Sequence, residues 1–548
     1  MQSRSSTGFV SAPSSERRRS FGLLVLIAAW WLCGLSVGFE PSLLFQPDGL
    51  SNASALIQGL LNPTFEADFV QRVLRLSVES FAIGVTGLAL ALFLGVPLGL
   101  LGARLPRLIQ GPSPNALQDS FTRWVRPVSR LVLTILRSIP EIIWAFLFVR
   151  ILGLGPGPAV LAIGLSFAGI IGKLFAELME SATPEPGQSL RRIGVSPFGV
   201  AFYGVLPQVR HQWVGYGLFR LECAIRSAAI LGVVGAGGLG TEIDLSIRYF
   251  EYDKLGTALI ALLVSIFLLE IVSRFLRKAA TRWSLIVVAL GAVLGSWSLG
   301  IAWLELFSMQ ALEQMILFVQ GFSEPSLDTQ FIWASVIGML ETIGMAFFAT
   351  AGAALCAFVL APLGAWQIVS FEYLKDAPKG TKHQGIFWGL MGMVRGLFQM
   401  LRAMPELVWA LIFVVWIGAG SMAGMMAIGV HTVGILGRLF GEVYEDIEER
   451  YPRALEARGA GRMGGWAYGV LPQALPQLLS FSLFRFEVNI RATAMVGFVG
   501  AGGIGDAIHT AISLFHFREL ATLLIILVVM VSFVDTLSSA LRFKILER

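Results

Sequence analysis

Four pairs of oppositely charged residues lie inside otherwise apolar stretches of this sequence. The members of each pair stand four positions apart: Arg137–Glu141, Glu222–Arg226, Arg402–Glu406 and Glu487–Arg491. In a helix this spacing places both members on one face, and charged groups in apolar helices usually face a polar interior or one another. Three interpretations follow: each pair is a self-satisfied structural ion pair, or its arginine faces a path for an anion, or it does both.

The anion interpretation centres on Arg226 and Arg491. Arginine carries a permanent charge and offers several hydrogen-bond donors to the oxygens of an anion. Glu222 and Glu487, one turn earlier, would hold each arginine in place and keep an empty path from binding an anion too tightly. The other candidates for this path lie in the same charged segments: Arg137, Glu141, Arg220, Arg402, Glu406, Arg485 and Asn489.

The composition shows what kind of element must position these charges. The chain has 548 residues, of which 55% are hydrophobic and only 14% charged, against about 25% charged in ordinary soluble proteins. Its mean hydropathy is +0.73. These values exclude a soluble enzyme, and the continuous apolar runs exclude an alternating outer-membrane barrel. The three cysteines and five histidines show no metal-ligand spacing, so no metal site is predicted.

Apolar runs long enough to cross a membrane recur along the whole chain. We expect about twelve spans, near residues 21–39, 77–103, 131–152, 158–179, 209–235, 256–276, 283–303, 332–366, 391–417, 422–441, 474–499 and 520–541. With the N-terminus inside, lysine and arginine concentrate in the inner loops, whereas the outer stretches 40–70 and 304–330 contain neither residue. The positive-inside rule then predicts that both termini lie on the cytoplasmic side of a bacterial inner membrane.

The two halves of the chain are copies of each other. Matching segments recur at one constant offset in the numbering: 137–141 with 402–406, 172–177 with 437–442, 203–208 with 468–473, 219–226 with 484–491, and 235–240 with 500–505. Six spans per copy is an even number, so both copies enter the membrane from the same side. We therefore predict an all-α polytopic membrane protein with two parallel six-helix repeats, residues 1–280 and 281–548.

A loop of the second half carries a specific resemblance. Residues 452–460 read PRALEARGA, and residues 468–473 read YGVLPQ. This pattern resembles the cytoplasmic coupling loop of ABC importer permeases, which has an E-A-A-like triplet, a following glycine and a later Leu-Pro. The resemblance implies short helices that sit in a cleft of the ATPase subunit, and it assigns these residues to the two loops: Gly194, Leu206, Pro207, Gly459, Leu471 and Pro472.

The loops depart from the family pattern in two places. Arg453 stands where the triplet has its glutamate, and the first half has only Gln188-Ser-Leu190 ahead of its glycine. A salt bridge made by that glutamate is therefore not carried over to this chain.

Later segments narrow the resemblance. Residues 485–491 (RFEVNIR), 499–505 (VGAGGIG) and 535–542 (DTLSSALR), together with Pro405-Glu406, look similar to permeases of phosphonate-type ABC importers. Those permeases are normally half this length and pair as dimers, so the resemblance implies that one chain supplies both halves of a type I, MetI-like permease. The first copy departs at Ala224, where the second copy has Asn489.

Both glycine-rich segments match G-x-G-x-x-G: Gly235, Gly237 and Gly240, then Gly500, Gly502 and Gly505. A dinucleotide site would need a strand before the motif and a helix after it, but here the motif ends an apolar helix. We expect a turn at the outer face, where small residues allow close packing across the repeat axis. No G-x-x-x-x-G-K-[ST] sequence occurs, so we expect no ATP hydrolysis and no cofactor in this chain.

The resemblance implies the membrane subunit of an ATP-driven importer for phosphonate, phosphite or phosphate. Its expected partners are two ABC ATPase subunits that carry ATP and Mg²⁺ at the cytoplasmic face, a periplasmic or lipoprotein substrate-binding protein, and membrane lipid, but not nucleic acid. Two alternatives stay open: an ABC importer for a solute such as methionine or a betaine, and a secondary transporter that needs no ATPase.

Overall fold

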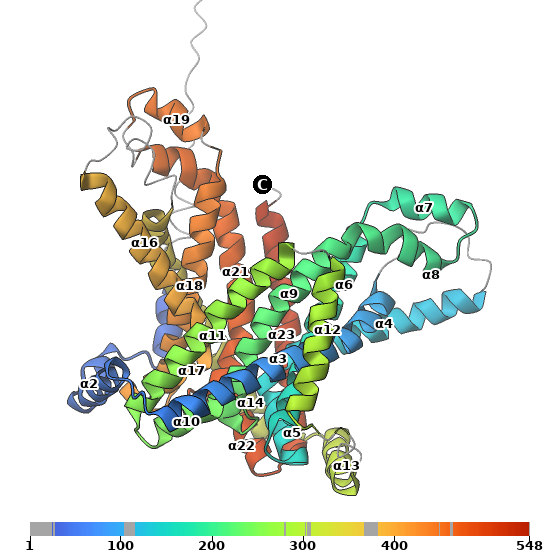
Figure 1. Ribbon diagram of the computed structural model, residues 1–548, viewed down its shortest axis with the longest axis horizontal. Helices are drawn as coiled ribbons and strands as arrows, with labels where there is room; N and C mark the ends of the chain where they lie inside the picture. Colours follow the sequence, from blue (N-terminus) through green and yellow to red (C-terminus); the bar gives the residue numbers. More distant parts are fainter. Residues whose placement is uncertain are drawn as a thin grey trace, which may run out of the picture.

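The protein is helical throughout the part of the chain that the computed structural model describes, and no strand occurs there (Figure 1). That part comprises residues 25, 28–103, 116–278, 281–301, 303, 308–365, 382–448, 450–460 and 464–546. Of the first expected span, 21–39, the helical residues 28–36 are described, and most of the remainder lies outside this part.

The first half runs from a short 3₁₀ helix, η1 (Pro41–Phe45), to α11. Its main helices are α2 (Pro47–Leu61), α3 (Ala67–Gly102), α4 (Ala116–Ser138), α5 (Glu141–Leu152), α6 (Pro156–Glu180), α7 (Pro184–Arg192), α8 (Pro197–Val200), α9 (Leu206–Leu231), α10 (Leu239–Arg248) and α11 (Tyr252–Lys278). A π-helical turn, η3 (Ala201–Val205), leads into α9, and a 3₁₀ turn, η4 (Gly232–Val234), follows it.

The second half repeats this order. Its helices are α12 (Thr281–Ser298), α13 (Met309–Ser323), α14 (Thr329–Gly364), α16 (Lys382–Ala403), α17 (Glu406–Ile417), α18 (Ser421–Asp446), α19 (Arg450–Glu456), α21 (Leu471–Val496), α22 (Ile504–Ser513) and α23 (Phe517–Leu546). The turns η6 (Gly465–Val470) and η7 (Gly497–Val499) again flank the long helix α21.

The element boundaries follow the repeat closely. Both ends of α9 and α10 match the ends of α21 and α22 at the offset that the sequence repeat shows. The helices α2 and α3 match α13 and α14 at a slightly smaller offset, so the spacing of the copies changes between the third and fourth helices of each copy. The repeat boundary predicted at 280/281 falls between α11 and α12, next to residues outside the described part, and stays a prediction.

Six of the described helices are long and apolar enough to cross a membrane, and four bent helix pairs raise this number to ten. The pairs are α4 with α5, α9 with α10, α16 with α17, and α21 with α22. The breaks after α4 and α16 fall inside the expected spans 131–152 and 391–417, whereas the other two lie at the ends of the expected spans 209–235 and 474–499. Two of the twelve expected spans are not among these ten. The span 21–39 is described only in part, and the apolar helix Ile286–Ser298 within 283–303 is too short to count as a span. The expected polytopic helical fold is confirmed.

The first helix of each copy packs against the third helix of the other copy. The Trp30 indole of the first copy donates to the carbonyl of Phe348 on α14 at 3.0 Å, and the two rings stack at 4.8 Å between centroids. In the same way α12 lies against α3, where a Cβ on Gly295 would stand 2.7 Å from the Thr86 hydroxyl. The copies are therefore interlocked, so they pack as one body.

Tight packing of small residues holds the helices of a copy together. A Cβ on Gly99 of α3 would stand 2.6 Å from the carbonyl oxygen of Gly172 on α6, so neither helix could approach this closely with larger residues there. Figure 1 shows α7 and α19 toward one end of the molecule, with the C-terminus, and α10, α13 and α22 toward the other. The long helices α9 and α21 run between these two ends.

Candidate functional site

The helices α9 and α21 bring the central charged residues of both copies together. Arg491 on α21 donates to the carbonyl of Arg137 on α4, at 3.4 Å, and so reaches from the second copy into the first. Arg226 on α9 reaches the other way, within electrostatic range of Glu406 and Arg485. The repeat-equivalent arginines 226 and 491 therefore lie at the contact between the copies.

The expected pairing of residues 137 with 141 and 402 with 406 on one helix face is wrong. A proline has no N–H and disfavours helical backbone in the preceding residue, so Pro140 and Pro405 each end one helix and precede the next. The helices before and after meet at 87° in the first copy and 90° in the second. Each arginine is therefore turned away from the glutamate that follows it and finds a different partner.

Those partners lie in the other copy. Arg137 forms an ion pair with Asp535 on α23, and both side chains are buried, 9% and 7% exposed. Arg402 pairs at 3.6 Å with Glu270 on α11. Because 402 and 270 are the repeat equivalents of 137 and 535, these two ion pairs between the copies are related by the repeat.

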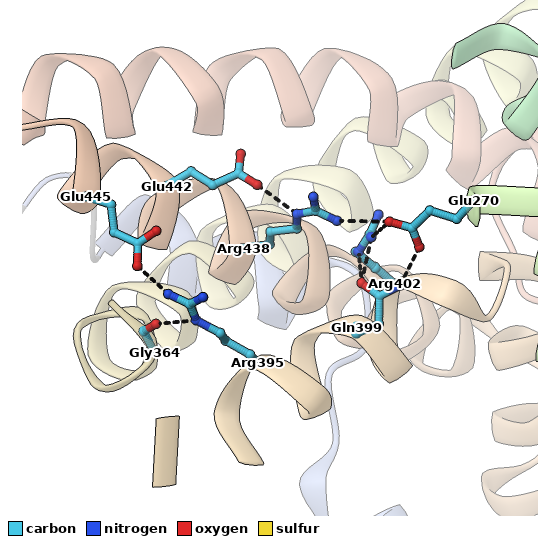
Figure 2. A network of polar contacts seen from close by, with 8 residues as sticks. All are labelled: Glu270, Gly364, Arg395, Gln399, Arg402, Arg438, Glu442 and Glu445. Carbon is cyan, nitrogen blue, oxygen red and sulfur yellow. Dashed lines mark hydrogen bonds and ion pairs between the residues drawn. The ribbon is translucent and has the colours of Figure 1, made fainter. Parts of the chain in front are cut away.

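The second of these pairs belongs to a wider network (Figure 2). Glu270 also accepts from the Gln399 amide at 3.1 Å and faces Arg438 at 3.9 Å. Arg402 in turn donates to the side-chain oxygen of Gln399 at 2.6 and 2.9 Å. Close to this network, Arg395 pairs with an acid of α18 and lines a cleft of about 280 Å³.

The central glutamates also differ from expectation. Glu487 does pair with Arg491, at 3.6 Å, but also with Arg542 on α23, at 3.3 Å. Glu222 pairs with Arg277 on α11 at 3.1 Å. No ion pair between Glu222 and Arg226 occurs in the described structure, so that predicted pair is wrong. The spacing of four positions was compatible with the pairing, but a residue on a neighbouring helix lies closer.

Three central arginines have a hydrogen-bond donor that no other described residue uses. The buried Nε atoms of Arg226, Arg485 and Arg491 have no hydrogen-bond partner among the described residues. A buried donor without a partner is costly, and three of them in one place indicate a site that can accept an oxygen-bearing ligand. Arg220 differs, because its Nε donates to the Tyr216 hydroxyl at 2.7 Å.

The second copy holds a buried polar cluster around Asn489. The amide nitrogen of this fully buried residue donates to the hydroxyls of Thr350 and Thr432, at 2.8 and 3.0 Å, and its oxygen accepts from Arg485 at 3.2 Å. Beside it, His431 faces Glu406 at 3.4 Å. Sequence analysis missed Thr350, Thr432 and His431, because single polar residues in apolar helices carry no spacing signal.

The remaining glutamate, Glu141, is held differently. Its carboxylate accepts from the Ser227 hydroxyl at 2.6 Å, within the first copy.

The positions of Asp535 and Glu270 do carry a sequence signal, because both are acids in apolar helices and they stand at the constant offset of the repeat.

The predicted coupling loops contain short helices, α7 and α19, as expected. Gly194 and Gly459 follow them with φ of 88° and 85°, and a Cβ at either position would meet no atom within 4 Å. The long helices then begin at Leu206-Pro207 and Leu471-Pro472. In both copies the glutamine after the proline donates at 2.6 Å to the carbonyl of a glycine in the π turn, which explains the Leu-Pro-Gln sequence.

The glycine-rich segments are turns, as expected, that need a left-handed backbone. Gly235 and Gly237 have φ near 80°, and so do Gly500 and Gly502. The expected packing across the repeat axis is wrong: a Cβ on Gly240 would stand 2.1 Å from the carbonyl of Ala229, and the atoms nearest to these glycines all belong to their own copy. The same holds for Gly505, whose Cβ would meet the carbonyl of Ala494 at 2.2 Å.

Side chains of the third helix hold these turns. The Ser80 hydroxyl accepts from the backbone N–H of Leu239, at 2.8 Å, and the Thr342 hydroxyl accepts from Ile504, at 2.9 Å. They satisfy free N–H groups at the start of α10 and α22. Within the described residues, no group of three or more His, Cys, Asp or Glu side chains is placed to hold a metal ion.

Comparison with known proteins identifies one family. The family described as "Binding-protein-dependent transport system inner membrane component" matches this chain twice, over residues 116–285 and 385–548. Both matches include a coupling segment, a long central helix and a glycine-rich turn. No solved structure matches the chain.

Three relatives illustrate the similarity. The phosphate-import permease protein PhnE of Mycolicibacterium smegmatis is 28% identical over 533 residues, which cover 95% of this chain and 93% of the relative. The phosphite transport system permease protein PtxC of Stutzerimonas stutzeri is 38% identical over 28% of this chain and 56% of its own length. The putative cryptic phosphonate transport system permease protein PhnE2 of Escherichia coli is 44% identical over 22% of this chain and 97% of its own length.

Proposed function

Because this chain belongs to the family of binding-protein-dependent transport system inner membrane components, we propose that it is the permease subunit of an ATP-driven importer for a phosphorus oxyanion. Relatives named for phosphate, phosphite and phosphonate support this substrate class. A relative named for D-methionine is 24% identical over 24% of this chain, which makes the methionine alternative the weaker one.

The observation that carries the proposal is the group of unpartnered guanidinium nitrogens at the contact between the copies. Arg226, Arg485 and Arg491 present permanent charge and free N–H donors there. A phosphorus oxyanion must give up water to cross a membrane, and charge-assisted hydrogen bonds from guanidinium groups replace the hydration that it loses. Glu487 beside Arg491 weakens that attraction enough for release.

The ion pairs between the copies connect this site to movement. Arg137–Asp535 and Arg402–Glu270 each join one copy to the other. Alternating access requires the copies to move relative to each other, so these are contacts that the movement breaks and restores. Two separate ATPase subunits, holding ATP and Mg²⁺, drive that movement by binding α7 and α19. In this proposal the chain itself is not an enzyme and carries no cofactor.

The remaining parts of the proposal concern the surroundings. The excess of lysine and arginine in the loops at the α7 and α19 end supports a cytoplasmic location for this end and for both termini, in a bacterial inner membrane. A periplasmic or lipoprotein substrate-binding protein then delivers the anion at the opposite end, near the glycine-rich turns.

Replacing Arg226 with glutamine tests the anion site most directly. Arg226 has no ion pair with Glu222, so its removal does not strand that carboxylate. We expect uptake of labelled inorganic phosphate, by cells that express the complete transporter, to fall at least about tenfold, because a hydrogen bond to a charged group contributes about 1.5–3 kcal/mol. The double variant Arg491→Met with Glu487→Gln should show the same loss.

The matched control is Arg274→Gln. Arg274 lies on α11 with an exposed side chain that donates to the backbone of its own helix, so this variant removes the same charge outside the proposed site. It should transport at the parent rate. If the Arg226→Gln and double variants assemble in normal amounts and also transport at that rate, the arginines are structural and the proposed site is wrong.

A further inference from the structure

His431 on α18 holds a defined tautomer. This buried residue is 4% exposed, and its Nδ1 lies 2.9 Å from the carbonyl oxygen of Met404. A carbonyl oxygen only accepts hydrogen bonds, so Nδ1 carries a hydrogen. The other ring nitrogen, Nε2, lies 3.4 Å from a carboxylate oxygen of Glu406.

This geometry favours one more proton. An unprotonated Nε2 and an ionised carboxylate are both acceptors and would repel each other at this distance. A proton between them makes the contact favourable, whether it lies on the imidazole or on the carboxyl group. In either form the His431–Glu406 pair has no net charge.

The charged groups that face this pair are two of the central arginines. Glu406 is within electrostatic range of Arg485 on α21 and Arg226 on α9, and His431 is within range of the same two. Both guanidinium groups have a buried Nε without a hydrogen-bond partner in the described structure. A free carboxylate at residue 406 would attract these donors, whereas a neutralised one leaves them available.

The first copy has no such arrangement. Ser166 occupies the place equivalent to His431, and Glu141, the equivalent of Glu406, accepts from the Ser227 hydroxyl at 2.6 Å. A hydroxyl donor leaves the carboxylate charged. Neutralisation by a histidine is therefore a property of the second copy.

We propose that His431 is a positioning residue that neutralises Glu406 and so keeps the guanidinium groups of Arg226 and Arg485 free for the transported oxyanion. This inference rests on the proposed function. Its consequence is that uptake follows the net charge of residues 406 and 431. Variants that leave Glu406 charged transport poorly, and variants that leave the pair neutral transport well.

Three variants of the full-length chain test this charge dependence, with uptake of labelled inorganic phosphate as the readout. His431→Gln leaves the carboxylate charged, and we expect uptake to fall about tenfold, as for one uncompensated charge ~10 Å from an anion at an effective dielectric constant of about 20. Glu406→Gln keeps the pair neutral and should stay within about twofold of the parent. The double variant is also neutral and should recover uptake to within about threefold.

The pH profile supplies a second readout. Inorganic phosphate itself gains and loses protons as the pH changes. At each pH, uptake by the parent is therefore divided by uptake by Glu406→Gln, so that the effect of the substrate's own titration cancels. This ratio should fall as the pH rises, because the parent pair loses its proton and becomes negative, whereas the variant pair stays neutral. The matched control in the first copy is Ser166→Ala, which changes no charge and should leave uptake and the ratio unchanged.

A purely structural role for His431 gives a different pattern. If the double variant transports as poorly as His431→Gln, or if His431→Gln transports like the parent, the inference is overturned. Should His431→Gln fail to accumulate in the membrane, Glu406→Gln decides: a loss of tenfold or a flat ratio overturns the inference, and normal uptake with a falling ratio supports it. If Arg226→Gln also transports normally, the proposed anion site fails together with this inference. If Arg226→Gln still loses uptake while the charge pattern at residues 406 and 431 fails, only this inference is overturned.

Discussion

The centres of the two copies occupy equivalent positions but are built from different kinds of residue. In the second copy Asn489 bonds the hydroxyls of Thr350 and Thr432. The equivalent residues of the first copy are all apolar and buried: Ala224, Leu88 and Phe167. Near them, the Arg220 guanidinium lies 5.7 Å from the Phe167 ring centroid, whereas Arg485 bonds an amide oxygen.

This difference shows what joining two copies in one chain permits. A dimer of identical subunits must build both sides of a central path from the same residues. Here each copy diverges while the framework stays the same, as the equivalent helix boundaries of α9 and α21 show. We therefore expect residues at the contact between the copies to contribute unequally, and residues of the shared framework to contribute equally.

The largest inequality should come from the two ion pairs between the copies. Replacing Asp535 with alanine leaves Arg137, which is 9% exposed, as an unpaired buried charge, and such a change typically costs about 3–5 kcal/mol. Glu270→Ala should cost less than half as much, because its partner Arg402 is 20% exposed and keeps its bonds to Gln399. Thermal unfolding of the purified chain in detergent measures both losses, and equal losses would contradict the comparison.

The second largest effect on stability should come from exchanging the residues at the equivalent positions 224 and 489. Ala224→Asn introduces an amide and extra volume into an apolar site and should cost about 3 kcal/mol. Asn489→Ala removes the partner of the buried Thr432 hydroxyl and one of the two partners of the Thr350 hydroxyl, which still donates to the Ala346 carbonyl, and it should cost about 1–3 kcal/mol.

Leu88→Thr and Phe167→Thr would supply the hydroxyl partners that the second copy has, but each also leaves a cavity in the core. The triple variant with Ala224→Asn should therefore lose less stability than the sum of the losses in Ala224→Asn and in the Leu88→Thr, Phe167→Thr double variant. Thermal unfolding again gives the values, and simple additivity would mean that the surrounding backbone, not these three side chains, makes the copies different.

The glycine-rich turns should behave identically in the two copies. A Cβ at Gly240 or Gly505 would stand 2.1 or 2.2 Å from a backbone carbonyl oxygen, so the chain must shift in either variant. We expect Gly240→Ala and Gly505→Ala to destabilise by about 1–3 kcal/mol each, as overpacking generally does. Losses that differ by more than about 1 kcal/mol would show that the framework has diverged as well.

The smallest expected difference lies at the coupling segments. The Gln208 side chain bonds both Gly204 and Thr183, where α7 begins, whereas in the second copy Glu448 stands in place of the threonine and pairs with Arg450. Gln208→Ala should therefore cost about 1 kcal/mol more than Gln473→Ala, the contribution of a typical hydrogen bond. Hydrogen exchange of α7 and α19 would measure this, with faster exchange in α7 of the Gln208 variant.

Much of this protein could be predicted from local patterns. Apolar runs locate the helices, because a membrane-spanning segment must bury its backbone groups whatever surrounds it. The constant offset between matching segments identifies the copies, and the glycine-rich segments predict the turns. The short coupling helices were predicted only because the loop resembles that of ABC importer permeases. Each of these predictions is read from short segments whose residues lie close together in the sequence.

The Glu487–Arg491 pair follows the spacing of four positions, but tertiary structure decided the partners of Arg137, Glu222 and Arg402. Spacing of four positions suggested partners on the same helix for Arg137 and Glu222, but a proline bend removed the first and a nearer arginine on α11 replaced the second. An ion pair forms with whichever opposite charge the packed helices bring closest, and interhelical distances are not written in sequence spacing. For the same reason His431 stood out only once Met404 and Glu406 were seen on either side of its ring.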